Sequence, residues 1–87
     1  MNPAAKALIV DDEEDLTELL STYFTQLGFE CTTAGNGQEA LSHLEKTDFD
    51  VMVTDLSMEP INGLQLVQSL KDLPRNQDLP TIMLSGY

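Results

Sequence analysis

Basic residues are scarce in this sequence. The 87 residues include four Lys and Arg against fifteen Asp and Glu, which gives a formal net charge of -11 at pH 7. A surface with this charge repels the phosphate backbone of DNA or RNA, because affinity for nucleic acid depends mainly on Lys and Arg contacts to phosphate. We therefore expect no direct binding to nucleic acid.

Cysteine and long apolar runs are also nearly absent. Cys31 is the one cysteine, so the sequence offers neither an internal disulfide nor a cysteine metal cluster, as is typical of a reducing compartment. The apolar runs, such as Ala7–Val10 and Thr81–Leu84, are far shorter than the roughly 20 residues of a membrane span. Residues Met1–Lys6 lack the apolar region of a signal peptide. These absences predict a cytoplasmic protein that does not contact a membrane.

The sequence does contain enough apolar residues for one small core. Hydrophobic residues make up 41% of the chain. The length is below the usual domain size of about 100–150 residues, so we expect one domain with a thin core.

Strand and helix patterns alternate along the whole chain. Short apolar runs predict strands, and apolar residues at helical spacing predict helices, the first of which ends at Gly28. The expected strands are Lys6–Val10, Phe29–Ala34, Asp50–Thr54 and Thr81–Ser85, and the expected helices are Asp15–Leu27, Gln38–Lys46 and Leu64–Leu73. This order, with strands apolar enough for burial on both faces, predicts an α/β fold in which helices cover a parallel sheet.

Polar residues follow three of the predicted strands. Asp11 and Asp12 end the first strand, Asp55 ends the third, and Ser85 ends the fourth. In open parallel sheets, ligands bind beyond the carboxyl ends of the strands, where the strand order reverses. If the first and third strands are neighbours, three carboxylates converge there and need a cation. Carboxylate oxygens with room for water are typical of a Mg²⁺ site.

Simpler explanations exist for each acidic residue taken alone. Acidic residues favour a helix start, where Asp12 can act as a cap, and an aspartate such as Asp55 often begins a turn. A calcium-binding EF-hand loop is excluded, because its sixth and twelfth positions are Leu16 and Thr22. A serine hydrolase is disfavoured, because no Ser-His-Asp pattern is visible around His43, which we expect to be solvated.

Three segments together resemble a known family. The segments "LIVDDEEDL", "VMVTDLSMEPINGLQL" and "LPTIMLSGY" are similar, in order and spacing, to the response-regulator receiver domain of bacterial two-component signalling. The resemblance covers almost all of residues 1–87, which it identifies as the N-terminal portion of a receiver domain. It implies a flavodoxin-like doubly wound parallel sheet of strand order 2-1-3-4, with the fifth strand and the last two helices missing.

The resemblance also implies a role for each site residue. Asp55 would be the phosphoacceptor, attacking the phosphorus of a phosphohistidine on a sensor histidine kinase or phosphotransfer protein. Asp12 would bind Mg²⁺ directly, Asp11 through water, and Ser57 through its backbone carbonyl, while Ser85 would hydrogen-bond a phosphoryl oxygen. Such a domain is not an enzyme in the usual sense, since at most it catalyses its own phosphorylation and dephosphorylation.

The sequence departs from the family in two places. Glu59 stands between the methionine and proline that usually adjoin after the acceptor, and it adds negative charge near the site. The chain also ends at Tyr87, and none of Lys6, Lys46 and Lys71 matches the lysine that in the family follows a fifth strand and contacts the phosphoryl group.

Two interpretations of the function remain open. The first is a phosphoacceptor receiver domain, and the alternative is a receiver-like interaction module that is not phosphorylated, or an inactive fragment. In the implied strand order, residues 82–84 form an edge with unpaired backbone groups, which favours pairing with another chain. We therefore expect that the chain is not a stable monomer, but is partly molten, aggregates, or completes its sheet through a dimer or a companion fragment.

Overall fold

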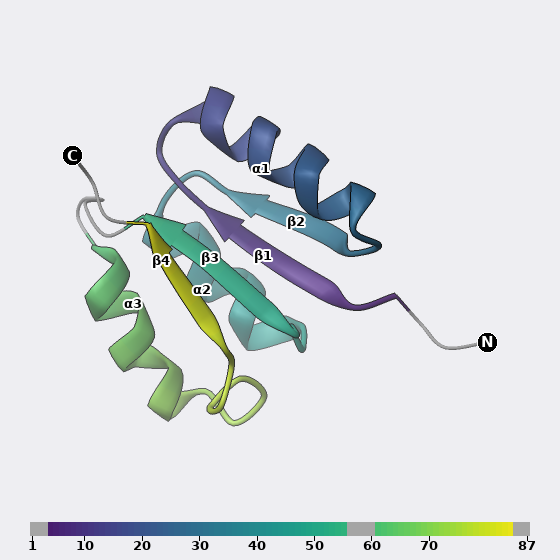
Figure 1. The fold of residues 1–87 in the computed structure, drawn as a ribbon. Helices are drawn as coiled ribbons and strands as arrows, with labels where there is room; N and C mark the ends of the chain where they lie inside the picture. The colour runs from purple at the N-terminus through teal and green to yellow at the C-terminus, as the bar shows by residue number, and fades with distance from the viewer. Residues whose placement is uncertain (1–3, 56–60, 85–87) are drawn as a thin grey trace.

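The structure is a computed structural model that describes residues 4–55 and 61–84 (Figure 1). Ser57, Glu59 and Ser85 therefore lie outside the described residues. Within the described ranges the elements are β1 (Lys6–Val10), α1 (Glu14–Gln26), β2 (Glu30–Ala34), α2 (Gly37–Lys46), β3 (Val51–Asp55), α3 (Gly63–Ser69), a 3₁₀ turn (Leu70–Asp72) and β4 (Thr81–Leu84). In these ranges no helix is long and apolar enough to span a bilayer.

The four strands form one parallel sheet in the order β2-β1-β3-β4, as expected. The chain leaves β1 for β2 on one side and returns for β3 on the other side of β1. The strand order therefore reverses between β1 and β3. Val10, at the end of β1, lies beside Ala34 of β2 and Thr54 of β3, so the three strands reach the same edge of the sheet.

Helices cover both faces of the sheet (Figure 1). On one face, α2 and α3 enclose the main core, which consists of Leu8, Val10, Ala34, Ala40, Leu44, Phe49, Met52, Leu66, Leu70 and Leu79. The intervening residues of the central strands, Ile9 and Val53, are also buried but point to the face that α1 covers. Burial on both faces explains the unbroken apolar runs Ala7–Val10 in β1 and Val51–Val53 in β3.

The end of α1 explains the role of Gly28. Gly28 has a φ of 100°, a conformation that side chains other than hydrogen disfavour. Its N–H donates to the carbonyl of Thr25, and the N–H of Phe29 donates to that of Phe24. The Phe24 and Phe29 rings then meet edge to face at 5.5 Å. This is a Schellman ending with its hydrophobic contact, and it turns the chain into β2.

Several element boundaries differ from the sequence expectation, most of them by one residue. The third strand includes Asp55, because the backbone of Asp55 pairs with Leu84. The second strand begins at Glu30, one residue after the turn that closes α1. The third helix was expected as one element through Leu73, but it ends at Ser69 and continues as a 3₁₀ turn. Tightening of the last turn is a common way for a helix to satisfy its final carbonyls.

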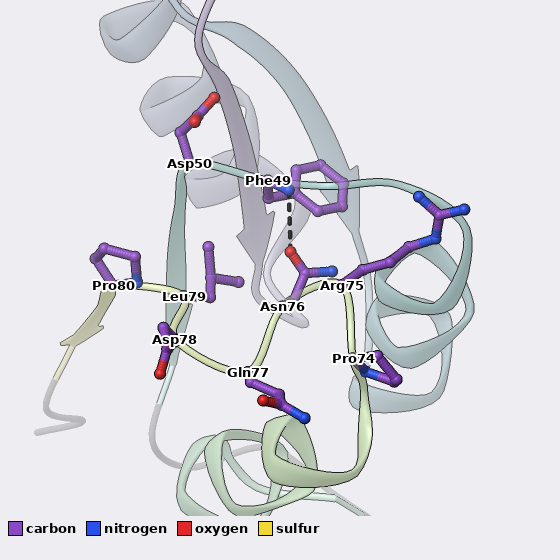
Figure 2. A pocket seen from close by; sticks show the side chains of 9 residues that line it. All are labelled: Phe49, Asp50, Pro74, Arg75, Asn76, Gln77, Asp78, Leu79 and Pro80. Atoms are coloured by element: carbon purple, nitrogen blue, oxygen red, sulfur yellow. Dashed lines mark hydrogen bonds between the residues drawn. The ribbon is translucent and has the colours of Figure 1, made fainter.

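The buried side chain of Asn76 connects the loop before β4 to the rest of the fold through hydrogen bonds (Figure 2). The side-chain oxygen of Asn76 accepts from the Phe49 N–H at 3.0 Å, and its amide donates to the carbonyls of Leu44 and Thr47 at 2.8 and 2.9 Å. Asn76 therefore caps the end of α2 and fixes the start of β3. An open pocket beside it is also lined by Asp50 and Pro80, which precede β3 and β4, so this pocket lies at the amino ends of the strands.

The β4 strand lies at the edge of the described sheet. Ile82 and Met83 are 48% and 39% exposed, although both are apolar. Because consecutive strand residues point to opposite faces, both faces of β4 are partly uncovered. The exposed apolar edge agrees with the sequence expectation, and the association expected from it stays a prediction.

Candidate metal centre

Three carboxylates meet at the carboxyl ends of β1 and β3. Asp11 and Asp12 directly follow β1, and Asp55 is the last residue of β3. One oxygen from each of the three lies within 4.8 Å of the others. The structure thus brings together, at the point where the strand order reverses, the three acidic residues that the sequence singles out.

Asp11 is the most buried of the three. It is 2% exposed, and its backbone N–H donates to the Ala34 carbonyl. Its Oδ1 accepts the backbone N–H of Glu13 at 2.8 Å, an interaction that fixes the carboxylate at the start of α1. Its Oδ2 is buried and has no hydrogen-bond partner among the described residues. A buried carboxylate oxygen is costly without a partner, so this atom is a suitable ligand for a cation.

The other two carboxylates lie nearer to solvent. Asp12 is exposed and Asp55 is half-buried. The N-cap of α1 is Glu13, which makes no side-chain capping hydrogen bond, so the structure does not support capping of α1 by Asp12. The helix therefore does not account for Asp12, and the carboxylate remains available to the cluster.

The electrostatics of the cluster favour a cation. Burial raises the pKa of Asp11 above 3.8, and the nearby charges of Asp55 and Asp12 raise this pKa further, against the lowering effect of the Glu13 N–H. All four basic side chains lie toward the opposite edge of the sheet, at the start of β1, the end of α2, the 3₁₀ turn and the loop before β4; they are Lys6, Lys46, Lys71 and Arg75. Within the described ranges, the protein's own basic residues do not neutralise the cluster. The donor set and its unpartnered buried oxygen therefore fit Mg²⁺.

Comparison with known proteins decides the family. The sequence profile of the response regulator receiver domain matches residues 7–87. The chain belongs to this family. Receiver domains are signalling domains of two-component systems, which agrees with the resemblance carried by the three sequence segments.

Individual relatives extend this assignment. The response regulator SaeR of Staphylococcus aureus is 41% identical over 79 residues, which are 91% of this chain and 33% of SaeR, so the chain spans about a third of that relative. Among solved structures, the chemotaxis response regulator CheY4 of Vibrio cholerae is similar with a TM-score of 0.87 and 31% identity, over 93% of this chain and 68% of CheY4. The response regulator TrrA of Thermotoga maritima, solved with Mg(2+)-BeF, has a TM-score of 0.85 and 32% identity, over 95% of this chain and 70% of TrrA.

The other residues that the sequence singled out do not belong to the carboxylate cluster as the structure describes it. Ser57 and Ser85 cannot be placed, because they lie outside the described residues. His43 lies in the last turn of α2, toward the opposite edge of the sheet from the cluster, so it does not join the three carboxylates. The backbone N–H of Glu13, which holds Asp11, was not among the groups expected at the site. An aspartate two residues before a helix N-cap is a known signal for such a bond and would have indicated it.

Proposed function

We propose that this receiver domain accepts a phosphoryl group on Asp55, with Mg²⁺ held by Asp11, Asp12 and Asp55. The observation that carries the proposal is the meeting of three carboxylates, with one oxygen of each within 4.8 Å of the others, beside a buried Oδ2 of Asp11 that has no hydrogen-bond partner among the described residues. Membership of the receiver family and the similarity to TrrA, which was solved with Mg(2+)-BeF, support it.

The phosphodonor would be a phosphohistidine on a sensor histidine kinase or a phosphotransfer protein. An Asp55 carboxylate oxygen attacks the phosphorus, the phosphorus–nitrogen bond breaks, and the imidazole leaves with that electron pair and takes up a proton. The product is an aspartyl phosphate. Transfer of this kind requires mainly that donor and acceptor be held in line.

The remaining groups would position the reactants. Mg²⁺ bound there would neutralise negative charge on the phosphoryl oxygens. Asp11, held by the Glu13 N–H, would contact the metal from the buried side of the site, and the exposed Asp12 would contact it from the solvent side. The resemblance adds the Ser57 carbonyl as a metal ligand and the Ser85 hydroxyl as a donor to the phosphoryl group.

Beryllofluoride binding tests the proposal without requiring a kinase. In the natural protein that contains residues 1–87, ¹⁹F NMR should show bound beryllofluoride when Mg²⁺ is present. The bound signal should be absent without Mg²⁺ and in Asp55→Asn, and it should persist in the control Asp78→Asn, whose exposed side chain lies in the loop before β4. If Mg²⁺ binds but beryllofluoride does not, the alternative of an interaction module that is not phosphorylated is favoured.

A further inference from the structure

One peptide unit connects the start of α2 with the metal centre. The peptide between Ala34 and Gly35 lies at the carboxyl end of β2, and its carbonyl accepts the backbone N–H of Asp11 at 3.1 Å. Its N–H donates to Oε2 of Glu39 at 2.5 Å. Because the carbonyl and the N–H of a trans peptide point in opposite directions, this unit holds Asp11 on one side and Glu39 on the other.

The bond from Gly35 to Glu39 strengthens the bond on the other side of the peptide. Its acceptor is a carboxylate, and hydrogen bonds to ionised acceptors are about twice as strong as bonds between neutral groups. Hydrogen bonds in a chain also polarise one another, so a peptide whose N–H donates to a carboxylate has a more strongly accepting carbonyl. Glu39 therefore strengthens the hydrogen bond that holds the backbone of Asp11.

The Glu39 bond differs from an ordinary helix cap. In a capping box, the side chain at the third helical position accepts the N–H of the N-cap residue itself. The α3 helix has this arrangement, because Gln65 accepts the N–H of Asn62 at 2.9 Å. The N-cap of α2 is Asn36, whose side chain accepts the Glu39 N–H at 2.8 Å, but the Glu39 side chain reaches one residue further back, to Gly35. Capping of α2 therefore does not explain the bond to Gly35.

The bond to the Ala34 carbonyl helps to place the Asp11 carboxylate. This bond fixes the backbone of Asp11 directly after β1, and the Glu13 N–H fixes its Oδ1. Together they determine where the buried Oδ2 lies, the oxygen that has no hydrogen-bond partner among the described residues. If the Ala34 carbonyl held Asp11 less firmly, the carboxylate could move relative to Asp12 and Asp55.

We infer that Glu39 is a positioning residue for the metal centre. Through the Ala34–Gly35 peptide it fixes the backbone of Asp11, and with it the carboxylate that would contact Mg²⁺ from the buried side. This inference rests on the proposed function. Glu39 is exposed and lines the same open cavity of about 350 Å³ as Asp11 and Asp12. It is not one of the three carboxylates whose oxygens lie within 4.8 Å of one another, so it acts through Asp11.

Two exchanges at position 39 separate the hydrogen bond from the charge. Glu39→Gln keeps an oxygen that can accept the Gly35 N–H but removes the negative charge. Glu39→Asp keeps the charge on a side chain one carbon shorter, which no longer reaches Gly35. In the natural protein that contains residues 1–87, Glu39→Asp should weaken Mg²⁺ binding about tenfold, as when groups that orient metal ligands are changed. Glu39→Gln should bind within about threefold of the wild type, and salt should reduce this difference by screening the lost charge.

NMR provides two independent measurements. Titration with Mg²⁺ gives the affinity, and the same spectra show whether each variant is folded. In the Mg²⁺-free protein, the scalar coupling between the Asp11 nitrogen and the Ala34 carbonyl carbon reports the hydrogen bond that joins them. This coupling should decrease in Glu39→Asp and stay close to the wild-type value in Glu39→Gln. The matched control is Glu45→Asp, the same exchange at an exposed position near the other end of α2, which should change neither measurement.

The outcomes separate the positioning role from the proposed function. Wild-type protein that does not bind Mg²⁺ would overturn the function itself. Wild-type protein that binds, together with a Glu39→Asp variant that binds equally well or keeps the Asp11–Ala34 coupling, would overturn the positioning role alone. A loss in Glu39→Gln as large as that in Glu39→Asp would also overturn it, because the bond to Gly35 would then not be the cause. If Glu39→Asp does not fold, Glu39→Ala, a strong helix former, replaces it in the comparison with Glu39→Gln.

Discussion

The carboxylates of Asp11 and Asp55 approach each other from the ends of adjacent parallel strands, although two helices and a strand separate these strands in the sequence. Asp11 lies buried and is held by the Glu13 N–H, whereas Asp55 is half-buried at the end of β3. Two like charges so placed repel each other unless a cation or a proton lies between them.

Removal of Asp12 should weaken the metal site without disturbing the fold. Asp12 is exposed and makes no cap for α1, so Asp12→Ala should leave the unfolding transition nearly unchanged. It should lower the affinity for Mg²⁺ by about tenfold or more, as expected when a group of the metal site is lost. The matched control is Asp15→Ala, which removes the same charge from the first turn of α1. Equal Mg²⁺ affinities in Asp12→Ala and Asp15→Ala, measured by NMR titration, would remove Asp12 from the site.

The stability of the Mg²⁺-free protein should depend on pH through Asp11. Because burial raises the pKa of Asp11 above 3.8, the folded state binds this proton more tightly than the unfolded state. Ionised Asp11 therefore opposes folding at neutral pH. The stabilising contribution of its protonated form is fully present below pH 3.8 and is lost as the pH rises through the folded-state pKa.

Asp11→Asn isolates this effect from the other acidic residues. Asparagine keeps the oxygen that accepts the Glu13 N–H but does not titrate in this range. The free energy of unfolding of wild type minus that of Asp11→Asn, measured by urea denaturation without Mg²⁺, should increase as the pH is lowered. A difference that is constant, or that decreases on acidification, would show that Asp11 is not destabilised by its surroundings.

Loss of the Asn76 side chain should destabilise the fold strongly. Asn76→Ala leaves the Phe49 N–H and the carbonyls of Leu44 and Thr47 without their partner in a largely buried position. We expect the free energy of unfolding to fall by about 3 kcal/mol, since each unsatisfied buried group costs about 1–3 kcal/mol. The control is Gln77→Ala, because Gln77 is exposed. Similar urea midpoints for the two variants would contradict the structural role of Asn76.

The exposed edge of β4 should promote association. Ile82 and Met83 are apolar and exposed on opposite faces of an edge strand, a combination that favours pairing between chains. Association of residues 1–87 should strengthen as salt screens the net charge of -11. Size-exclusion chromatography with light scattering should show this increase, and Ile82→Lys should reduce it. A protein that stays monomeric at every salt and protein concentration, with a sharp unfolding transition, would contradict the prediction.

The sequence predicts the elements well, because they depend on local patterns, and it places each acidic residue of the cluster at the end of a strand. The first strand is found at Lys6–Val10 as expected, and Gly28 ends α1 through a conformation that suits glycine. The strand order and the roles of single residues at the site came from the family resemblance, since composition and periodicity do not specify which strands are neighbours.

Features that depend on contacts between distant residues could not be predicted. The bonds of Asn76 and the close approach of Gly37 to Ile61 both arise from packing between separate elements. The unpartnered Oδ2 of Asp11 is likewise a result of burial in the folded protein, and no pattern in residues 11–15 indicates it.

The most direct test of the central claim is intact-mass analysis after treatment with a small acyl phosphate. In the natural protein that contains residues 1–87, the mass should increase by one phosphoryl group when Mg²⁺ is present, with the modification on Asp55. The increase should be absent in Asp55→Asn and strongly reduced when Mg²⁺ is removed. Labelling that survives Asp55→Asn, or that proceeds equally without Mg²⁺, would contradict the account of a metal-assisted phosphoacceptor at Asp55.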